Sequence, residues 1–420
     1  MRRSLRSLVF IVVIVAASGA VAAAQESAPS RPTPTDQAEA ATQESAASRS
    51  SLIEQAQAAK AEQLRPAQRG KAEEYVSRIS DALLSGQMHW HTFWQNAYSG
   101  GGFTLGAGYT HFVSSYNTID VRGSITFSGY KRLESEFIAP DLFARRGRLS
   151  VIGGWREATE VGFYGFGMTS TKENRANYSF QQPYFNGTLE VFPTKKLFML
   201  KGGLELTQWK QAAGSGSAPS VETVYTSSTL PGLGASPVYV HSQGTIGLDS
   251  RPARGYAKRG GFYGVTLHDF TDSDAQYGFR RVDYEGIQHI PILRDAWVIS
   301  LHARAEMAYD KSGQTIPFFM MPSIGGGSNL RAYNSWRLRD LNSLYLQGEW
   351  RAIVNRYFDV ALFYDAGKVA AHRSDLDLHG MKSDVGLGFR WHGPASTPLR
   401  IEFTKGNEGF ALVFAASEVF

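Results

Sequence analysis

From about residue 100 to the end of the chain, apolar and polar residues alternate with a period of two. Successive side chains of a β-strand point to opposite faces, so this alternation predicts strands with one apolar and one polar face. Such segments number about fifteen, with four between 103 and 157, six between 176 and 309, and five between 342 and 416. The clearest apolar series are Ile119, Val121, Ile125 and Phe127; Trp297, Ile299, Leu301, Ala303, Ala305, Met307 and Tyr309; Val385, Leu387, Phe389 and Trp391; and Leu399, Ile401 and Phe403.

Two architectures produce this pattern: a soluble sandwich or barrel with an apolar core, and a membrane barrel with an apolar outside. Many candidate strands reach nine or more residues, which matches a tilted bilayer crossing better than a soluble strand. The charged residues Arg304, Glu306 and Arg390 lie mid-strand on the polar side, as a wet lumen permits. Because single-chain bacterial barrels have an even number of strands, the sequence predicts an all-β, transmembrane antiparallel barrel of sixteen strands.

The N-terminus has the three parts of an export signal. Arg2, Arg3 and Arg6 precede an apolar run at 8–15, and small residues follow up to Ala24. We therefore predict a signal peptide at 1–24. Residues 25–98 read as a periplasmic leader, flexible at first and then an amphipathic helix at about 71–85, and residues 99–420 as the outer-membrane barrel.

Composition narrows the function classes. The chain has no cysteine, which excludes disulfides, thiolate metal sites and thiol nucleophiles. Its formal charge of +5 falls once the signal arginines are removed, so nucleic acid is not an expected partner. We expect no cofactor, no metal and no catalytic residue. His241 and Ser242 are adjacent, so they point to opposite strand faces and do not suit a hydrolase site.

Two motifs carry a family resemblance. Residues 323–351 read SIGGGSNLRAYNSWRLRDLNSLYLQGEWR, and 363–367 read FYDAG. The first resembles the sixth extracellular loop and following strand of the BamA/TamA superfamily of outer-membrane assembly and translocation barrels (bacterial surface antigen barrel domain). That loop carries an aliphatic-Arg-Gly-aromatic motif, and the second stretch is similar to the family's Phe-x-Asp-x-Gly strand motif. The matching positions are Leu330, Arg331, Ala332 and Tyr333 in the loop, and Phe363, Asp365 and Gly367 in the strand.

The resemblance implies that Arg331 holds its loop inside the barrel. Alternation places Glu349 and Asp365 on the lumen face of neighbouring strands, where an arginine fork suits bidentate contact with carboxylates. Ala332 stands where the family has glycine. If that glycine has a positive φ, alanine is strained there and the loop follows a different path.

The last residues resemble the assembly signal of exported outer-membrane barrels, which end in an aromatic residue with apolar partners at alternate positions. Glu418 departs from that pattern. The expected partners are outer-membrane lipid, the barrel-assembly machinery during biogenesis, and a protein or lipid substrate. The residues of the signal are Phe410, Leu412, Phe414 and Phe420.

Three functions remain open at this point. Family members that insert or secrete proteins carry periplasmic α/β modules, and residues 25–98 show no alternating strands, so we expect a barrel-only member. The first hypothesis is movement or insertion of protein or lipid through a lateral seam between the first and last strands. The second is a passive outer-membrane pore, and the third an outer-membrane hydrolase.

Overall fold

The computed structural model describes residues 51–57, 59, 89–194, 197–293, 295–394 and 396–415 of the 420-residue chain. The expected signal peptide at 1–24 and the expected helix at 71–85 lie outside the described residues. The chain divides into two units, Met1–Glu74 and Tyr75–Phe420. In the first unit, residues 51–57 and 59 are helical. Within the described ranges, no helix is long and apolar enough to cross a membrane.

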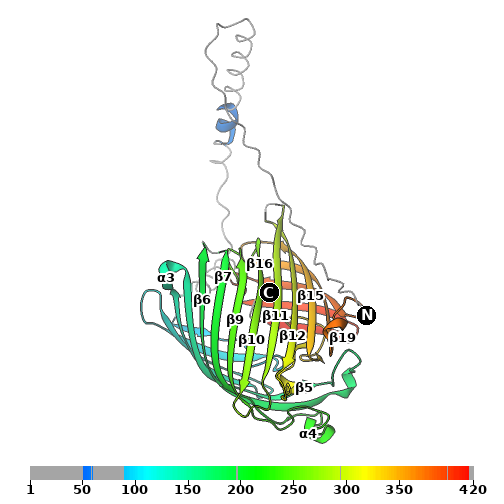
Figure 1. Ribbon diagram of the computed structural model, residues 1–420. Coiled ribbons are helices and arrows are strands. Elements are labelled where there is room, and N and C mark those ends of the chain that lie inside the picture. The colour runs from blue at the N-terminus through cyan, green and yellow to red at the C-terminus, as the bar shows by residue number, and fades with distance from the viewer. Residues whose placement is uncertain are drawn as a thin grey trace, which may run out of the picture. The chain divides into compact units, whose positions relative to one another are not determined.

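The second unit is built on one large antiparallel sheet, in which β6, β7, β9, β10, β11 and β12 stand side by side as a curved wall (Figure 1). Its strands are β1 (Trp90–Thr92), β2 (Thr104–Phe112), β3 (Thr118–Thr126), β4 (Lys131–Asp141), β5 (Gly147–Phe163), β6 (Ala176–Thr194), β7 (Phe198–Gln208), β8 (Lys210–Ala213), β9 (Val238–Asp249), β10 (Gly260–Asp272), β11 (Phe279–Ile292), β12 (Trp297–Asp310), β15 (Asn342–Ile353), β16 (Phe358–Ala370), β17 (Lys382–Trp391), β18 (Leu399–Gly406) and β19 (Gly409–Ala415).

Among the described residues, the connections between the strands of the large sheet contain short elements. A separate two-stranded sheet joins β13 (Ser323–Ile324) to β14 (Leu338–Arg339) between β12 and β15. The remaining elements are α3 (Leu142–Arg145), η1 (Lys172–Asn174), α4 (Val221–Val224), η2 (Phe318–Met320) and η3 (Arg373–Asp375).

Each strand of the wall pairs with the next along the chain. β7 and β8 both pair with β6, one beyond the other, so they form one interrupted strand. The 17 strands of the described sheet therefore occupy sixteen positions, in agreement with the predicted count. The strand that the sequence pattern missed is β1, which spans only three residues and pairs with β2 before the expected barrel start at residue 99.

The wall has its apolar face outside and its polar face inside, as the alternation predicts. Leu301 and Leu362 are 47% and 49% exposed on the outer face, whereas Glu349 and Asp365 are 3% and 0% exposed on the inner face. In water this distribution exposes a large apolar area, which soluble monomers avoid. A hydrocarbon surround removes that cost, so the fold is a transmembrane barrel.

Both ends of the lumen are occupied by connections. At the end where β12 passes into β15, an apolar cluster includes Phe163, Tyr178, Phe180, Leu230 and Phe318, all 2% exposed or less. At the other end, the turn 250–259 between β9 and β10 is folded inward, with Tyr256 5% exposed. We call these the loop end and the turn end.

Candidate functional site

The loop 322–341 between β12 and β15 enters the lumen, and we call it the inner loop. Arg331 lies at its centre and is 1% exposed. The Arg331 Nε donates to Asp365 Oδ2 at 2.6 Å and Nη2 donates to Asp365 Oδ1 at 2.9 Å, a bidentate contact. Nη1 donates to Glu402 Oε1 at 2.8 Å. One guanidinium thus joins the inner loop to β16 and β18.

The three residues of the strand motif share the lumen face of β16 and each meets the inner loop. The guanidinium carbon of Arg331 lies 3.5 Å from the centroid of the Phe363 ring. The Asp365 carboxylate forms the bidentate ion pair with Arg331. At Gly367, an added Cβ would lie 2.7 Å from Ile324 Cδ1 and 3.3 Å from Leu330 Cδ1. The motif therefore supplies a stacking surface, a counter-charge and room for the apolar side chains of the loop.

We expect Gly367→Ala to destabilise the packing of the inner loop by about 1–3 kcal/mol, because a methyl group is forced into a filled space. Denaturant unfolding of the detergent-solubilised barrel, read by protease access to the inner loop, measures the effect. Gly348→Ala is the matched control, since its Cβ would come no closer than 3.9 Å to Leu301. Equal behaviour of the two variants would contradict this reading of the motif.

Glu349 lies near Arg331 without bonding to it closely. Its Oε2 is 3.7 Å from Arg331 Nη1, and Glu349 instead accepts a hydrogen bond from Arg390. Glu402, which alternation on β18 also places on the lumen face, is a closer partner of Arg331 than Glu349 and was missed by the sequence reasoning. Arg400 Nη1 also donates to Glu402, at 2.7 Å. The inner loop is thus held in a network of carboxylates and arginines.

The backbone at Ala332 is not strained. Ala332 does not have a positive φ, so the expectation of strain at this position is wrong. Its N–H donates to Asp384 Oδ2 at 2.9 Å, which fixes the loop to β17. The neighbouring Leu330 is fully buried. Burial raises the pKa of the Tyr333 phenol, which keeps its proton and donates to the Ser383 carbonyl at 3.2 Å.

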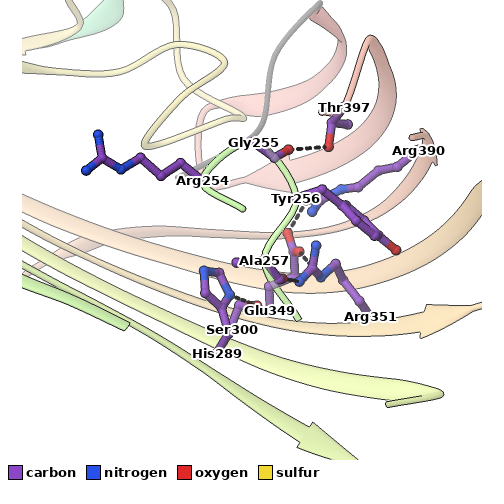
Figure 2. A pocket seen from close by; sticks show the side chains of 10 residues that line it. All are labelled: Arg254, Gly255, Tyr256, Ala257, His289, Ser300, Glu349, Arg351, Arg390 and Thr397. Atoms are coloured by element: carbon purple, nitrogen blue, oxygen red, sulfur yellow. Dashed lines mark hydrogen bonds and ion pairs between the residues drawn. The ribbon is translucent and has the colours of Figure 1, made fainter. Parts of the chain in front are cut away.

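A second arrangement closes the turn end of the lumen, and Figure 2 shows Tyr256, Ala257 and Arg351 of this arrangement. The Tyr256 hydroxyl donates to Asp359 Oδ2 at 2.7 Å, and its ring stacks on His392 with centroids 3.9 Å apart. Arg351 donates to the carbonyl of Ala257. The turn between β9 and β10 is thereby fastened to β15, β16 and the end of β17.

Of the residues of the expected assembly signal, three face the lipid and one lies outside the described residues. Phe410, Leu412 and Phe414 on β19 are 66%, 46% and 59% exposed, on the lipid side, and Phe420 lies outside the described residues. His241 is buried beside His268, with Nε2 3.0 Å from His268 Nδ1, while Ser242 is exposed on the opposite face.

Residues 249–409, which run from the end of β9 to the start of β19 and include both motifs, match the Omp85 superfamily domain. The chain is a β-barrel of the bacterial outer membrane that is similar, over this stretch of less than half its length, to the Omp85 superfamily.

Among solved structures, the chain is similar to BamA from Haemophilus ducreyi lacking POTRA domains 1–3 (TM-score 0.54, 14% identity, covering 81% of this chain and 76% of that one). It is also similar to CdiB from Escherichia coli (TM-score 0.50, 12% identity, 75% of this chain and 59% of that one). At these identities the likeness is one of fold, and this chain spans about three fifths of CdiB. No curated protein sequence matches.

Proposed function

We propose that this barrel moves or inserts protein or lipid through a lateral seam between its first and last strands, and that Arg331 locks the inner loop inside the lumen. The observation that carries the proposal is the buried contact of Arg331 with Asp365 on β16 and Glu402 on β18. β18 pairs with β19, the last strand of the sheet. A loop tied to β18 therefore senses or restrains movement at the seam.

The substrate class follows from the wall rather than from a pocket. An opened seam presents unpaired backbone groups and a path from the polar lumen to the apolar exterior, which suits an incoming strand or a lipid chain. Outer-membrane lipid surrounds the barrel, and the barrel-assembly machinery inserts it during biogenesis. We assign no catalytic role to any residue.

Neither alternative gains support from the lumen. A steady pore needs an open path, and the apolar cluster at the loop end and the Tyr256 turn at the other end both obstruct one. A hydrolase built on His241 and the adjacent Ser242 is not supported, since Ser242 points outward while His241 is buried beside His268.

A disulfide across the seam tests the proposal. The chain has no native cysteine, so a cysteine at His91 on β1 paired with one at Ala411 or Val413 on β19, all on the lumen face, forms the only possible disulfide. We expect the oxidised pair to abolish complementation of an envelope defect in a deletion strain, and a reductant to restore it. Each single-cysteine variant is the control. Full activity of a crosslinked barrel would refute a seam mechanism.

A further inference from the structure

Two adjacent residues of the inner loop contact opposite sides of the proposed seam. On the last-strand side, Arg337 Nε and Nη2 donate to Glu408 Oε2 and Oε1, both at 2.8 Å. Glu408 lies in the turn between β18 and β19. Arg337 is 1% exposed, and its guanidinium also donates to the hydroxyl and carbonyl oxygens of Ser170 at 2.9 and 2.7 Å. This bidentate ion pair holds the last hairpin against the inner loop.

On the first-strand side, the Trp336 indole N–H donates to the carbonyl of Ser99 at 2.9 Å. Ser99 belongs to the segment 93–103, which connects β1 to β2. That segment is itself fastened to the neighbouring strands, since the Ser124 hydroxyl donates to the Gln95 carbonyl at 2.8 Å and the Ser128 hydroxyl to the Gly101 carbonyl at 2.6 Å. Trp336 is therefore joined to the first strands of the barrel as a group.

The backbone at this point is held in an uncommon conformation. Trp336 has a φ of 64°, in the left-handed region that bulky residues rarely adopt. Such a conformation persists only where surrounding contacts determine it. Here those contacts are the Ser99 bond, the Arg337 pair one residue later, and the Arg339 guanidinium 5.4 Å from the indole ring. The turn at Trp336 directs the two consecutive side chains toward the two sides.

We infer that Trp336 and Arg337 are positioning residues that staple the first strands to the last hairpin at the loop end of the seam. The inference rests on the proposed function, because it names the contact that must break when the seam opens. The two strands at the seam are short, with three residues in β1 and seven in β19. Side-chain contacts at the loop end therefore stabilise the closed seam beyond what backbone pairing of such short strands can supply. Breaking the Arg337–Glu408 ion pair is the step that releases the last hairpin.

The test measures the separation of the two sides directly. Spin labels on cysteines at Phe127, 85% exposed beside β3, and at exposed Lys405 on β18 report that distance in the full mature chain in liposomes. Glu408→Gln keeps the size of the side chain and removes its charge, and we expect it to raise the population at long distance roughly tenfold. Trp336→Phe keeps the ring and removes the donor, and we expect a smaller rise in the same direction. Glu173→Gln, an exposed acid on η1, is the matched control.

Distance distributions of Glu408→Gln and Trp336→Phe that equal that of Glu173→Gln would overturn the staple. Trp336→Phe keeps the test decisive if Glu408→Gln does not fold, which heat-dependent migration in detergent gels reveals. The disulfide across the seam addresses the proposed function separately. Activity that survives the crosslink, together with a widened distance in Glu408→Gln, would refute the seam mechanism and leave the staple as a structural contact.

Discussion

Replacing Arg331 with alanine is expected to free the inner loop from the lumen while the barrel wall stays folded. The substitution leaves the fully buried Asp365 without the cation that compensates it, while Glu402 keeps its ion pair with Arg400. Removing one partner of a buried ion pair costs about 3–5 kcal/mol, because the remaining charge is desolvated and unpaired. The wall keeps its strand pairing, which does not involve Arg331. Limited proteolysis within 322–341 should therefore accelerate, while heat-dependent gel migration stays that of a barrel, and activity should fall.

Two variants show whether the fork or the charge matters. Arg331→Lys keeps the charge and loses the bidentate geometry, so we expect an intermediate protease sensitivity. Arg280→Ala removes an arginine whose side chain is 70% exposed, and we expect no change. Unchanged cleavage of the inner loop in Arg331→Ala would show that other contacts, such as Ala332 N–H to Asp384, are sufficient to hold it.

The sequence predicted those parts of the site that depend on local periodicity. Strand alternation alone placed Glu349 and Asp365 on the lumen face, and both are there. It could not rank Glu349 against Glu402 as the partner of Arg331, because that choice depends on how deep the loop descends between β15 and β18. The absence of strain at Ala332 has the same origin, since a backbone φ in a long loop follows from tertiary contacts rather than from the residue type.

The alternation of apolar and polar residues could not predict contacts between segments that lie far apart along the chain. β1 is too short to show alternation, and it became visible only through its pairing with β2. Trp336 and Arg337 lie in the quoted motif region, yet their partners Ser99 and Glu408 lie far away along the chain and carry no signal of their own. The folded-in turn at Tyr256 likewise depends on Asp359 and His392, which reach it only after the barrel has formed.

Replacing Phe318 with alanine is expected to loosen the loop end of the lumen and produce a measurable ion conductance. Phe318 on η2 is fully buried, and its ring lies 4.8 Å from that of Tyr178 and 5.3 Å from that of Phe163. Truncating such a phenylalanine costs about 3–5 kcal/mol in lost burial and cavity formation. That cost falls on the apolar cluster formed by the connections and the loop-end residues of β5 and β6, while the strand pairing of the wall is untouched. Planar-bilayer recordings should show a closed wild-type barrel and frequent openings in Phe318→Ala.

The comparison with a lipid-facing phenylalanine separates loss of the cluster from a general loss of apolar area. Phe185 on β6 is 56% exposed on the outer face, so Phe185→Ala removes the same atoms from a position in contact with hydrocarbon. We expect its conductance to equal that of the wild type, because neither end of the lumen is altered. If Phe318→Ala stays silent, the Tyr256 turn suffices to close the lumen, and Phe318→Ala combined with Tyr256→Ala should then conduct. If the wild type already conducts steadily, the apolar cluster does not seal the barrel, and the result supports the passive-pore hypothesis.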